Sequence, residues 1–468
     1  MNITRTKIVA TLGPSWYSKS MIEKMIVAGM NVVRINMSHY NSDFNLPLIV
    51  QQIRKASKNQ NKSIAILMDL PGPKIRTANK DIISIRRGKE YTLGAEADIP
   101  INTQLKYNKI SNNAKVKIDD GKLSFKVVKK ITASKIRIKA LNSAKIYTRK
   151  GVNISGLDIG LPSISKQDLK YVKLAAELDL DWIALSFVQS KSDREPIDKL
   201  FKRLKKNIPL IAKIEKPEAV EDIDSIIESF DGILIARGDL GLEMELEKVP
   251  SLQKKIIKKC NEKCKPVITA TQMLESMIKS PLPTRAEVND VAGAIYDGSD
   301  AIMLSGETAI GKFPLESIRM MKSITTNVEK EIMENEGFSR LVKTPEKNNP
   351  KKSICNSAYQ MSEDLSIKVM VVMTESGNTG NTLSSFRPSS VIIAMTPKEN
   401  VYRRLSLSWG ILPVKVRKFR STDQMLDFNK KFLINNNIIK KDDMFVMTAG
   451  VPVGVTGSTN MIKIEKVE

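Results

Sequence analysis

The stretch LIAKIEKPEAVEDIDSIIESFDGILIARGDL, residues 210 to 240, contains a complete strand–helix–strand repeat. Its two strand candidates, LIAKIE and GILIAR, are short, near-continuous apolar runs, which is typical of strands buried on both faces of a parallel sheet. Between them, the segment from Pro217 to Ser229 has the apolar spacing of an amphipathic helix. This repeat predicts neighbouring parallel strands joined by a helical crossover.

The same apolar run recurs on both sides of this repeat, so that eight strand candidates lie between Thr6 and Ser305. They are KIVATLG from Lys7, NVVRIN from Asn31, SIAILMDL from Ser63, WIALSF from Trp182, LIAKIE from Leu210, GILIAR from Gly232, VITATQ from Val267 and AIMLS from Ala301. Helical patterns separate them, as at 18–29 and 165–178. Eight buried strands alternating with helices predict an α/β fold with a closed TIM (β/α)8 barrel.

The spacing is broken once, between Asp69 and Trp182. That gap contains IISIRRGKEYTL, KVKIDDGKLSFKVV and SKIRIKAL, which alternate in polarity and carry turn residues. Such segments are hairpin signals. We therefore expect a small β-barrel lid domain inserted at 72–158, with the catalytic barrel at 1–71 and 159–340.

A third unit follows a predicted helix at 314–336. The polar stretch KTPEKNNPKK indicates a linker, placed at 341–352. Beyond it, VMVVMTES from Val369, SVIIAMT from Ser390, ILPVKV from Ile411 and MFVMTAG from Met444 alternate with helical segments. These predict a C-terminal open-sheet α/β domain at 353–468, with a regulatory or oligomerisation role.

Composition limits the classes of protein to consider. The chain has 468 residues, 41% of them hydrophobic, and no apolar run near the roughly 20 residues that span a bilayer. Its three cysteines are too few for a disulfide framework, so we expect a cytoplasmic protein. The net charge of +24 favours contact with phosphates. Because the lysines are dispersed and aromatics make up only 5%, we expect no nucleic-acid binding.

Charged and polar side chains gather at the carboxyl ends of the predicted strands, where barrels of this kind carry their function. The residues are Arg34, Asn36, Ser38, Asp69, Lys213, Glu215, Arg237, Gly238, Asp239, Thr271 and Ser305. Any single one is most simply an ion pair or cap at a strand end. Together they indicate an anion site with a divalent metal, because Glu215 and Asp239 offer the oxygen ligands that suit Mg²⁺. With one histidine, His39, a zinc hydrolase or a Ser-His-Asp triad is disfavoured.

IPLIAKIEKPEAV, from Ile208, resembles the signature of the pyruvate kinase family. Around it, KIVATLGP, VVRINMSH, DLPGPKIRT, KGVNISG, ARGDLG, ITATQMLESM, PTRAEVNDVA and LSGET follow in the family's order. The resemblance implies a glycolytic transferase that moves the phosphoryl group of phosphoenolpyruvate to ADP, giving pyruvate and ATP. It also implies a homotetramer.

The resemblance also implies roles for individual residues. Glu215 and Asp239 would hold Mg²⁺, for which Mn²⁺ can substitute, and Lys213 would neutralise the phosphoryl group in transfer. Arg34 would hold phosphate, and the N–H groups of Gly238 and Asp239 would hold the substrate carboxylate beside Thr271. Thr271 and Ser305 would lie on a water relay that protonates the enolate. Further residues are expected at the nucleotide (Arg76, His39 and Lys150, with Arg149 and Asp120 on the lid) and at a monovalent cation (Asn36, Ser38, Asp69 and Leu70).

The sequence departs from the family pattern at Lys74, at Leu70, which replaces a threonine common beside the cation, and in one loop of the third domain. Lys74 stands where potassium-dependent members carry glutamate, so its ammonium is expected to replace K⁺; a lysine that only faces solvent is the alternative. The loop TESGNT, with Thr374, Ser376, Gly377 and Thr379, resembles an effector site for a sugar phosphate or AMP. Asn378 replaces a frequent arginine there and Glu375 adds negative charge, so a bisphosphate is disfavoured.

Two rival interpretations remain. One keeps the barrel and the metal but has another reaction of phosphoenolpyruvate or pyruvate, against which the inserted and C-terminal domains weigh. The other is a basic binding or regulatory protein on a degenerate enzyme scaffold. A degenerate site would be expected to have lost at least one of Lys213, Glu215, Asp239 and Thr271, and all four are present.

Overall fold

The computed structural model describes residues 4–40, 45–103, 114–154, 163–335, 349–452 and 459–467. Eight parallel strands close into a barrel in the order β1-β16-β15-β14-β13-β12-β3-β2. Their bounds are β1 Lys7–Thr11, β2 Val32–Asn36, β3 Ala65–Asp69, β12 Trp182–Leu185, β13 Leu210–Ile214, β14 Gly232–Ala236, β15 Val267–Ala270 and β16 Ala301–Leu304. All eight predicted strands are confirmed, and with them the barrel.

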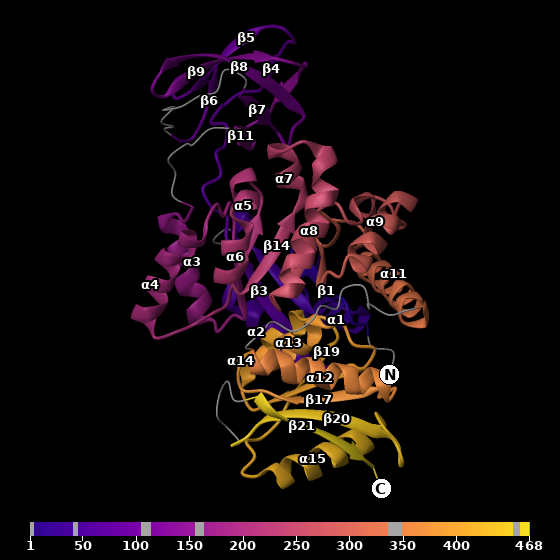
Figure 1. Cartoon of the computed structure of the whole chain (residues 1–468). Coiled ribbons are helices and arrows are strands. Elements are labelled where there is room, and N and C mark those ends of the chain that lie inside the picture. The colour runs from indigo at the N-terminus through magenta and orange to yellow at the C-terminus, as the bar shows by residue number, and fades with distance from the viewer. Residues whose placement is uncertain are drawn as a thin grey trace.

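The helices form the outer layer of the barrel (Figure 1). They are α1 Lys19–Ala28, α2 Leu46–Asn59, α3 Lys166–Glu177, α4 Glu195–Leu204, α5 Pro217–Glu221, α6 Ile223–Ser229, α7 Arg237–Glu243, α8 Val249–Glu262, α9 Arg285–Tyr296, α10 Gly306–Ala309 and α11 Pro314–Asn335. The expected helix at 217–229 is two helices. Asp222 leaves the helical conformation with ψ 19° and its carboxylate accepts a hydrogen bond from Ser225, a local bond that competes with the helix.

The inserted segment packs around its own apolar core. Its strands are β4 Ile83–Ile85, β5 Glu90–Gly94, β6 Ile99–Pro100, β7 Lys115–Ile118, β8 Leu123–Thr132, β9 Lys135–Ala140, β10 Ala144–Ile146 and β11 Val152–Ile154. The described strands form a six-stranded sheet, β11-β7-β8-β9-β5-β6, and a separate pair, β10-β4. Antiparallel bridges from Arg76 to Gly151, beside β11, and from Thr77 to Ile101, beside β6, connect the two edges of this sheet, as expected for a small barrel.

The lid lies beyond the carboxyl ends of the barrel strands, over α7 (Figure 1). Asn153 of β11 donates to Glu243 Oε1 at 3.0 Å, and Lys117 Nζ of β7 donates to the carbonyl of Gly241 at 3.4 Å. These bonds join the lid to α7, whose first turn carries Asp239.

The C-terminal domain is an open five-stranded sheet in the order β19-β18-β17-β20-β21. Its elements are α12 Pro350–Asp364, β17 Val369–Met373, α13 Asn378–Ser385, β18 Val391–Thr396, α14 Glu399–Arg404, β19 Ile411–Lys415, α15 Thr422–Asn435, β20 Met444–Gly450 and β21 Thr459–Lys466. The four predicted strands are present. The antiparallel edge strand β21 was not predicted.

The linker expected at 341–352 ends before residue 352, where the next helix has already begun. α12 begins at Pro350, because Asn349 accepts a hydrogen bond from the N–H of Lys352 and proline is compatible with a first helical turn. Residues 341–348 lie outside the described residues.

The C-terminal domain closes the base of the barrel, opposite the lid (Figure 1). Leu407 packs into the apolar interior of the barrel. Arg403 binds the buried Asp181 at 2.7 Å, and Arg387 donates to Asn261 at 2.8 Å. The barrel is thus joined to one domain at each end.

Candidate active site

Lys213 is the centre of the polar cluster at the barrel mouth. It lies on β13, 9% exposed, with Nζ 2.8 Å from Glu215 Oε1, 3.2 Å from Asp69 Oδ1 and 2.7 Å from the Ser186 hydroxyl, to which it donates. Burial alone would lower the pKa of Lys213, but the negative charges of Asp69 and Glu215 raise it above its ordinary value. The ammonium is therefore charged at every physiological pH.

Arg34 and Asp69 form the second pair of the cluster. Arg34 Nε donates to Asp69 Oδ2 at 2.7 Å, and Nη1 donates to Thr11 Oγ1 at 2.9 Å. Burial alone would raise the pKa of Asp69, but Lys213 and Arg34 hold it below its ordinary value. Asp69 Oδ1 is buried and faces the Lys213 ammonium at 3.2 Å. One carboxylate thus fixes two cations side by side.

Glu215 and Asp239 supply the two carboxylates expected at a metal. Glu215 is buried and accepts a hydrogen bond from the N–H of Phe187 at 2.8 Å. Asp239 lies in the first turn of α7, the helix that follows the neighbouring strand β14. Burial, and to a lesser extent the charge of Asp239, raises the pKa of Glu215, against the opposing effect of Lys213. Within the described ranges, no group of three or more His, Cys, Asp or Glu is arranged as a complete metal site.

The turn after β15 has a strained backbone. Thr271 has φ 72°, a value that is rare for a β-branched residue, and Gln272 follows with φ 53°. Arg237 holds this turn by donating to the carbonyl of Thr271 at 2.7 Å, and it also binds Asp290 at 2.6 Å. Thr271 Oγ1 accepts the N–H of Gly238 at 2.8 Å. The threonine hydroxyl is thereby placed against the start of α7.

Ser305 follows β16, the neighbour of β15 in the barrel. Its N–H donates to Glu307 Oε2 at 2.7 Å. It lies at the same rim as Thr271, although no contact between the two is present among the described residues.

A cluster of cations surrounds the only histidine. His39 is in the short 3₁₀ turn after β2, and burial lowers its pKa below the ordinary value of 6.5, with further lowering by Arg76, Arg34 and Lys74. Lys74 Nζ lies 3.9 Å from Asp239 Oδ1. Lys74 therefore connects this cluster to Asp239.

On the lid, Lys150 pairs with Asp119 at 2.8 Å. Sequence reasoning named the next residue, Asp120, which is exposed, whereas Asp119 is buried. Arg76 Nη1 donates to the carbonyl of Arg149 at 3.2 Å, so these lid cations are near each other.

The residues expected at a monovalent cation are partly engaged with one another. Asn36 Oδ1 accepts the N–H of Ser38 at 3.1 Å, and the carbonyl of Leu70 accepts the Ser186 hydroxyl at 2.7 Å. Asp69 faces Arg34 and Lys213. The ion pair of Lys74 is made with Asp239 and not with this group.

Sequence reasoning did not single out Ser186, Phe187 and Thr11, all of which position site side chains, and it placed Arg237 at the rim without a specific role. Ser186 links Lys213 to Leu70, and it directly follows β12 in the run WIALSF. The same signal that found the other residues, a polar side chain at a strand end, could have found it.

The effector-loop residues lie at the start of α13. Thr374 Oγ1 accepts the N–H of Gly377 at 2.9 Å, and Thr379 is buried with its hydroxyl 2.7 Å from that of Thr459. Ser376 and Gly377 line a cavity between this domain and the barrel. Thr374 and Thr379 are therefore buried within the domain, whereas Ser376 and Gly377 face the cavity.

Two family descriptions match the chain: "Pyruvate kinase, barrel domain" over residues 3–318 and "Pyruvate kinase, alpha/beta domain" over residues 352–465. Pyruvate kinases of *Staphylococcus aureus* strains MRSA252 and USA300 are 41% identical over 478 aligned residues, covering 99% of this chain and 80% of theirs.

A solved structure of a pyruvate kinase from *Cryptosporidium parvum* superposes with a TM-score of 0.91 at 34% identity, covering 99% of this chain and 96% of that one. No described helix is long and apolar enough to cross a membrane. Sequence, fold and the converging barrel mouth agree, and the chain belongs to the pyruvate kinase family, the phosphotransferases that form pyruvate and ATP from phosphoenolpyruvate and ADP.

Proposed function

We propose that the cluster around Lys213 is the catalytic centre for phosphoryl transfer from phosphoenolpyruvate to ADP. The observation that carries this proposal is the convergence of Lys213, Glu215 and Asp69 within 3.2 Å at one rim, with Arg34 locked beside them. Phosphoryl transfer needs positioning and charge neutralisation more than covalent work by the protein. Two fixed cations supply the neutralisation.

Glu215 and Asp239 fit a Mg²⁺ ion, which Mn²⁺ can replace. Both are hard oxygen donors, and Mg²⁺ is commonly held by one or two carboxylates with substrate oxygens and water as the remaining ligands. A set of two rather than three carboxylates suits that arrangement. When bound, the metal supplies Lewis-acid polarisation of the phosphate and enol oxygens. Burial, and to a lesser extent the neighbouring charge of Asp239, raises the pKa of Glu215, and a bound cation would favour its charged form.

The roles of the remaining residues are proposed from their positions at the barrel mouth and on the lid. Arg34 and Lys213 bind phosphate, and the N–H groups of Gly238 and Asp239 bind the substrate carboxylate at the start of α7, where the N–H of Gly238 exchanges its acceptor Thr271 Oγ1 for that carboxylate. Thr271 and Ser305 belong to the rim that protonates the enolate. Arg76, His39 and Lys150 face the nucleotide, with the lid excluding water as it closes.

Metal binding provides the direct test. Glu215→Gln and Asp239→Asn keep the shape of each side chain and remove its charge, so both should raise the Mg²⁺ concentration needed for half-maximal pyruvate formation by at least roughly tenfold. Glu218→Gln, on the exposed face of α5, is the charge-matched control. Unchanged Mg²⁺ dependence in both site variants would refute the assignment.

Lys74 is proposed to replace a bound K⁺ at the same mouth. Its ammonium, half-buried and 3.9 Å from Asp239, brings one positive charge to the substrate site. The enzyme should therefore keep most of its activity in potassium-free buffer, whereas Lys74→Glu should need KCl. A wild-type activity that collapses without K⁺ and returns on its addition would contradict this proposal.

The finer points of assembly and regulation are also proposals. The family resemblance favours a homotetramer in the cytoplasm. The loop with Thr374, Ser376, Gly377 and Thr379 is proposed to bind a sugar phosphate or AMP, because its small residues and N–H groups suit a phosphate.

A further inference from the structure

The turn that follows β12 holds two charged side chains of the barrel mouth. Ser186 Oγ accepts a hydrogen bond from Lys213 Nζ at 2.7 Å, and the N–H of Phe187 donates to Glu215 Oε2 at 2.8 Å. Lys213 and Glu215 are themselves paired at 2.8 Å. Two consecutive residues of one turn therefore contact both the ammonium and the carboxylate at the centre of the proposed phosphoryl transfer.

The hydroxyl of Ser186 has a defined direction. It donates its single proton to the carbonyl of Leu70 at 2.7 Å, so its oxygen is left to accept from the ammonium of Lys213. Ser186 is 4% exposed, and the N–H of Leu70 in turn donates to the carbonyl of Ala184 at 2.9 Å. The two carboxylates beside Lys213 attract its ammonium by charge, whereas the serine is a neutral contact that limits where the ammonium can lie.

The backbone of this turn is strained. Phe187 has φ 56°, a left-handed conformation that is uncommon for a residue with a large side chain. Such a conformation persists only where the surrounding contacts fix it, and it is enriched at functional sites. The N–H of this same residue is the one that donates to Glu215, so the strain and the contact with the carboxylate occur together.

Gly72 packs directly on this turn, at the point where the chain leaves β3 for the inserted lid. A Cβ at Gly72 would lie 3.0 Å from both Ser186 Cβ and Phe187 Cδ2, and the glycine has φ 63°. A side chain there would press on the turn and strain the backbone. In addition, the N–H of Gly72 donates to Oδ1 of the buried Asp168 at 3.3 Å. Gly72 therefore connects α3 with the turn after β12.

The second connection between barrel and lid also approaches this turn. The Phe187 ring lines a small cavity of about 40 Å³ together with Pro73 and Lys74 from the first connection and with Val152 and Asn153 of β11. Interiors of this kind are closely packed and transmit displacements between neighbouring groups. A movement of the lid consequently changes the contacts of the turn.

We propose that Ser186 and Phe187 are positioning residues for phosphoryl transfer, which keep Lys213 and Glu215 in place and couple them to the lid through the contact at Gly72. This inference rests on the proposed function, in which Lys213 neutralises the phosphoryl group and Glu215 holds the metal. Neither positioning residue is required to touch a substrate. Their contribution is geometric, because a displacement of about 1 Å can cost a large part of the rate.

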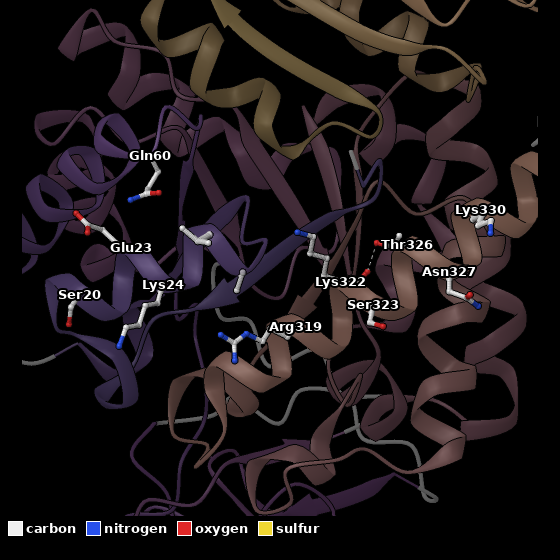
Figure 2. Close-up of a pocket in the computed structure, with 12 residues that line it drawn as sticks. Ser20, Glu23, Lys24, Gln60, Arg319, Lys322, Ser323, Thr326, Asn327 and Lys330 are labelled. Carbon is white, nitrogen blue, oxygen red and sulfur yellow. Dashed lines mark hydrogen bonds between the residues drawn. The ribbon is translucent and has the colours of Figure 1, made fainter. Parts of the chain in front are cut away.

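A double-mutant cycle tests the role of Ser186. Ser186→Ala should lower kcat for pyruvate formation roughly tenfold and change KM for phosphoenolpyruvate less than about threefold, because the ammonium stays but loses its neutral contact. Since the serine acts through Lys213, the same substitution should have little further effect in a Lys213→Met background. Ser323→Ala is the matched control and should change neither constant. Ser323 is exposed on α11, beside the groove between α1 and α11 that Figure 2 shows.

Two glycine substitutions test the coupling to the lid. Gly72→Ala introduces a Cβ against the turn, whereas Gly88→Ala introduces one at φ 81° with nothing within 4 Å among the described residues. Both carry the same kind of backbone strain, so their difference reports the contact with Ser186 and Phe187. We expect Gly72→Ala to lower kcat roughly tenfold and to weaken Mn²⁺ binding, measured by electron paramagnetic resonance without substrates, roughly threefold or more. Gly88→Ala should change neither.

The possible results distinguish this inference from the proposed function. A loss in Ser186→Ala that is equally large in the Lys213→Met background, or a rise in KM alone, contradicts the role of the serine. Equal effects of the two glycine substitutions, or no effect of either, contradict the coupling and leave Lys213 and Glu215 in their proposed roles. Full activity of Lys213→Met overturns the proposed function as well. Circular dichroism establishes that each variant is folded, and the glycine pair remains decisive if Ser186→Ala is not.

Discussion

Lys213 combines three roles in one side chain at the barrel mouth. It offsets the charges of Asp69 and Glu215, it donates to Ser186, and it presents an ammonium to the space above β13. Since both carboxylates are buried, the same contacts that stabilise the ammonium also keep it in place. Charge that is fixed before the substrate arrives needs no reorganisation during the reaction.

Replacing Lys213 should therefore affect kcat much more than substrate affinity. We expect Lys213→Met to lower kcat by a factor of about 10² to 10³, the usual effect of removing one fixed charge from a transition state. Pyruvate formation at saturating phosphoenolpyruvate measures this. Lys258→Met, on the exposed face of α8, serves as the control. Lys213→Arg, compared with Lys213→Met, reports whether a positive charge alone restores folding and part of the rate. Full activity in Lys213→Met would remove this residue from the mechanism.

His39 offers a second residue-scale measurement, because the chain has a single histidine. Its pKa should lie below 6.5 in the free protein, owing to burial and to Arg76, Arg34 and Lys74. An anion bound among these cations should raise that pKa. A tag-free NMR titration of the imidazole, with and without phosphoenolpyruvate and Mg²⁺, follows both values without any assignment problem.

The lowered pKa of His39 also determines how the stability of the protein depends on pH. The unfolded chain binds the proton more readily than the folded one, so this histidine reduces stability as pH falls through 6.5 towards the folded-state value. His39→Gln should lack that component. A folded-state pKa above 6.5 without ligand would contradict the cation cluster.

At the scale of elements, α14 is the connection that joins the C-terminal sheet to the barrel. Arg403, near its end, binds Asp181 and Asp179 together, and Asp181 also accepts the N–H of Ile66 in β3. The pair of Arg403 with Asp181 is almost fully buried. Removing Arg403 would leave the buried Asp181 with Arg54 alone, whose Nη2 lies 2.9 Å from Oδ2, and would leave Oδ1 without its cation.

Arg403→Met should consequently be strongly destabilising, by the order of 3 kcal/mol. The thermal and urea midpoints, followed by circular dichroism, report this loss. Lys173→Met on α3 is the comparison, because Lys173 makes an exposed pair with Glu177 at 3.8 Å and should change stability by less than about 1 kcal/mol. Similar shifts in the two variants would show that the α14 joint is not a stabilising contact.

At the scale of the whole molecule, the positive charge is unevenly distributed. The described part of the lid, 72–103 and 114–154, has 18 Lys or Arg against 6 Asp or Glu, half of the chain's +24. In the sheet Lys126 lies opposite both Lys115 and Lys139, which is unfavourable for like charges. This concentration corrects the impression of evenly dispersed lysines. It places a positive field over the mouth to which both substrates, which are anions, must come.

Substrate capture should therefore depend on ionic strength. Raising tetramethylammonium chloride from 0.05 to 0.5 M shortens the screening length to about 4 Å, so KM for phosphoenolpyruvate should rise roughly two- to tenfold while kcat changes less. Lys126→Gln/Lys129→Gln/Lys130→Gln should reduce that dependence. A salt effect confined to kcat would argue against capture by the lid's field.

The sequence alone determined the order of strands and helices, because each barrel strand is buried on both faces and so appears as an uninterrupted apolar run. It also determined which strand ends carry charge, as Lys213 and Glu215 do. Only the tertiary structure decided which of these side chains meet. Lys213 reaches Ser186 and Asp69, and Lys74 reaches Asp239, through the closure of the barrel and the position of the lid. A cavity of about 780 Å³ at the base of the barrel is likewise lined by residues of both the barrel and the C-terminal domain, such as Lys205 and Arg404, whose charges become neighbours only in the folded chain.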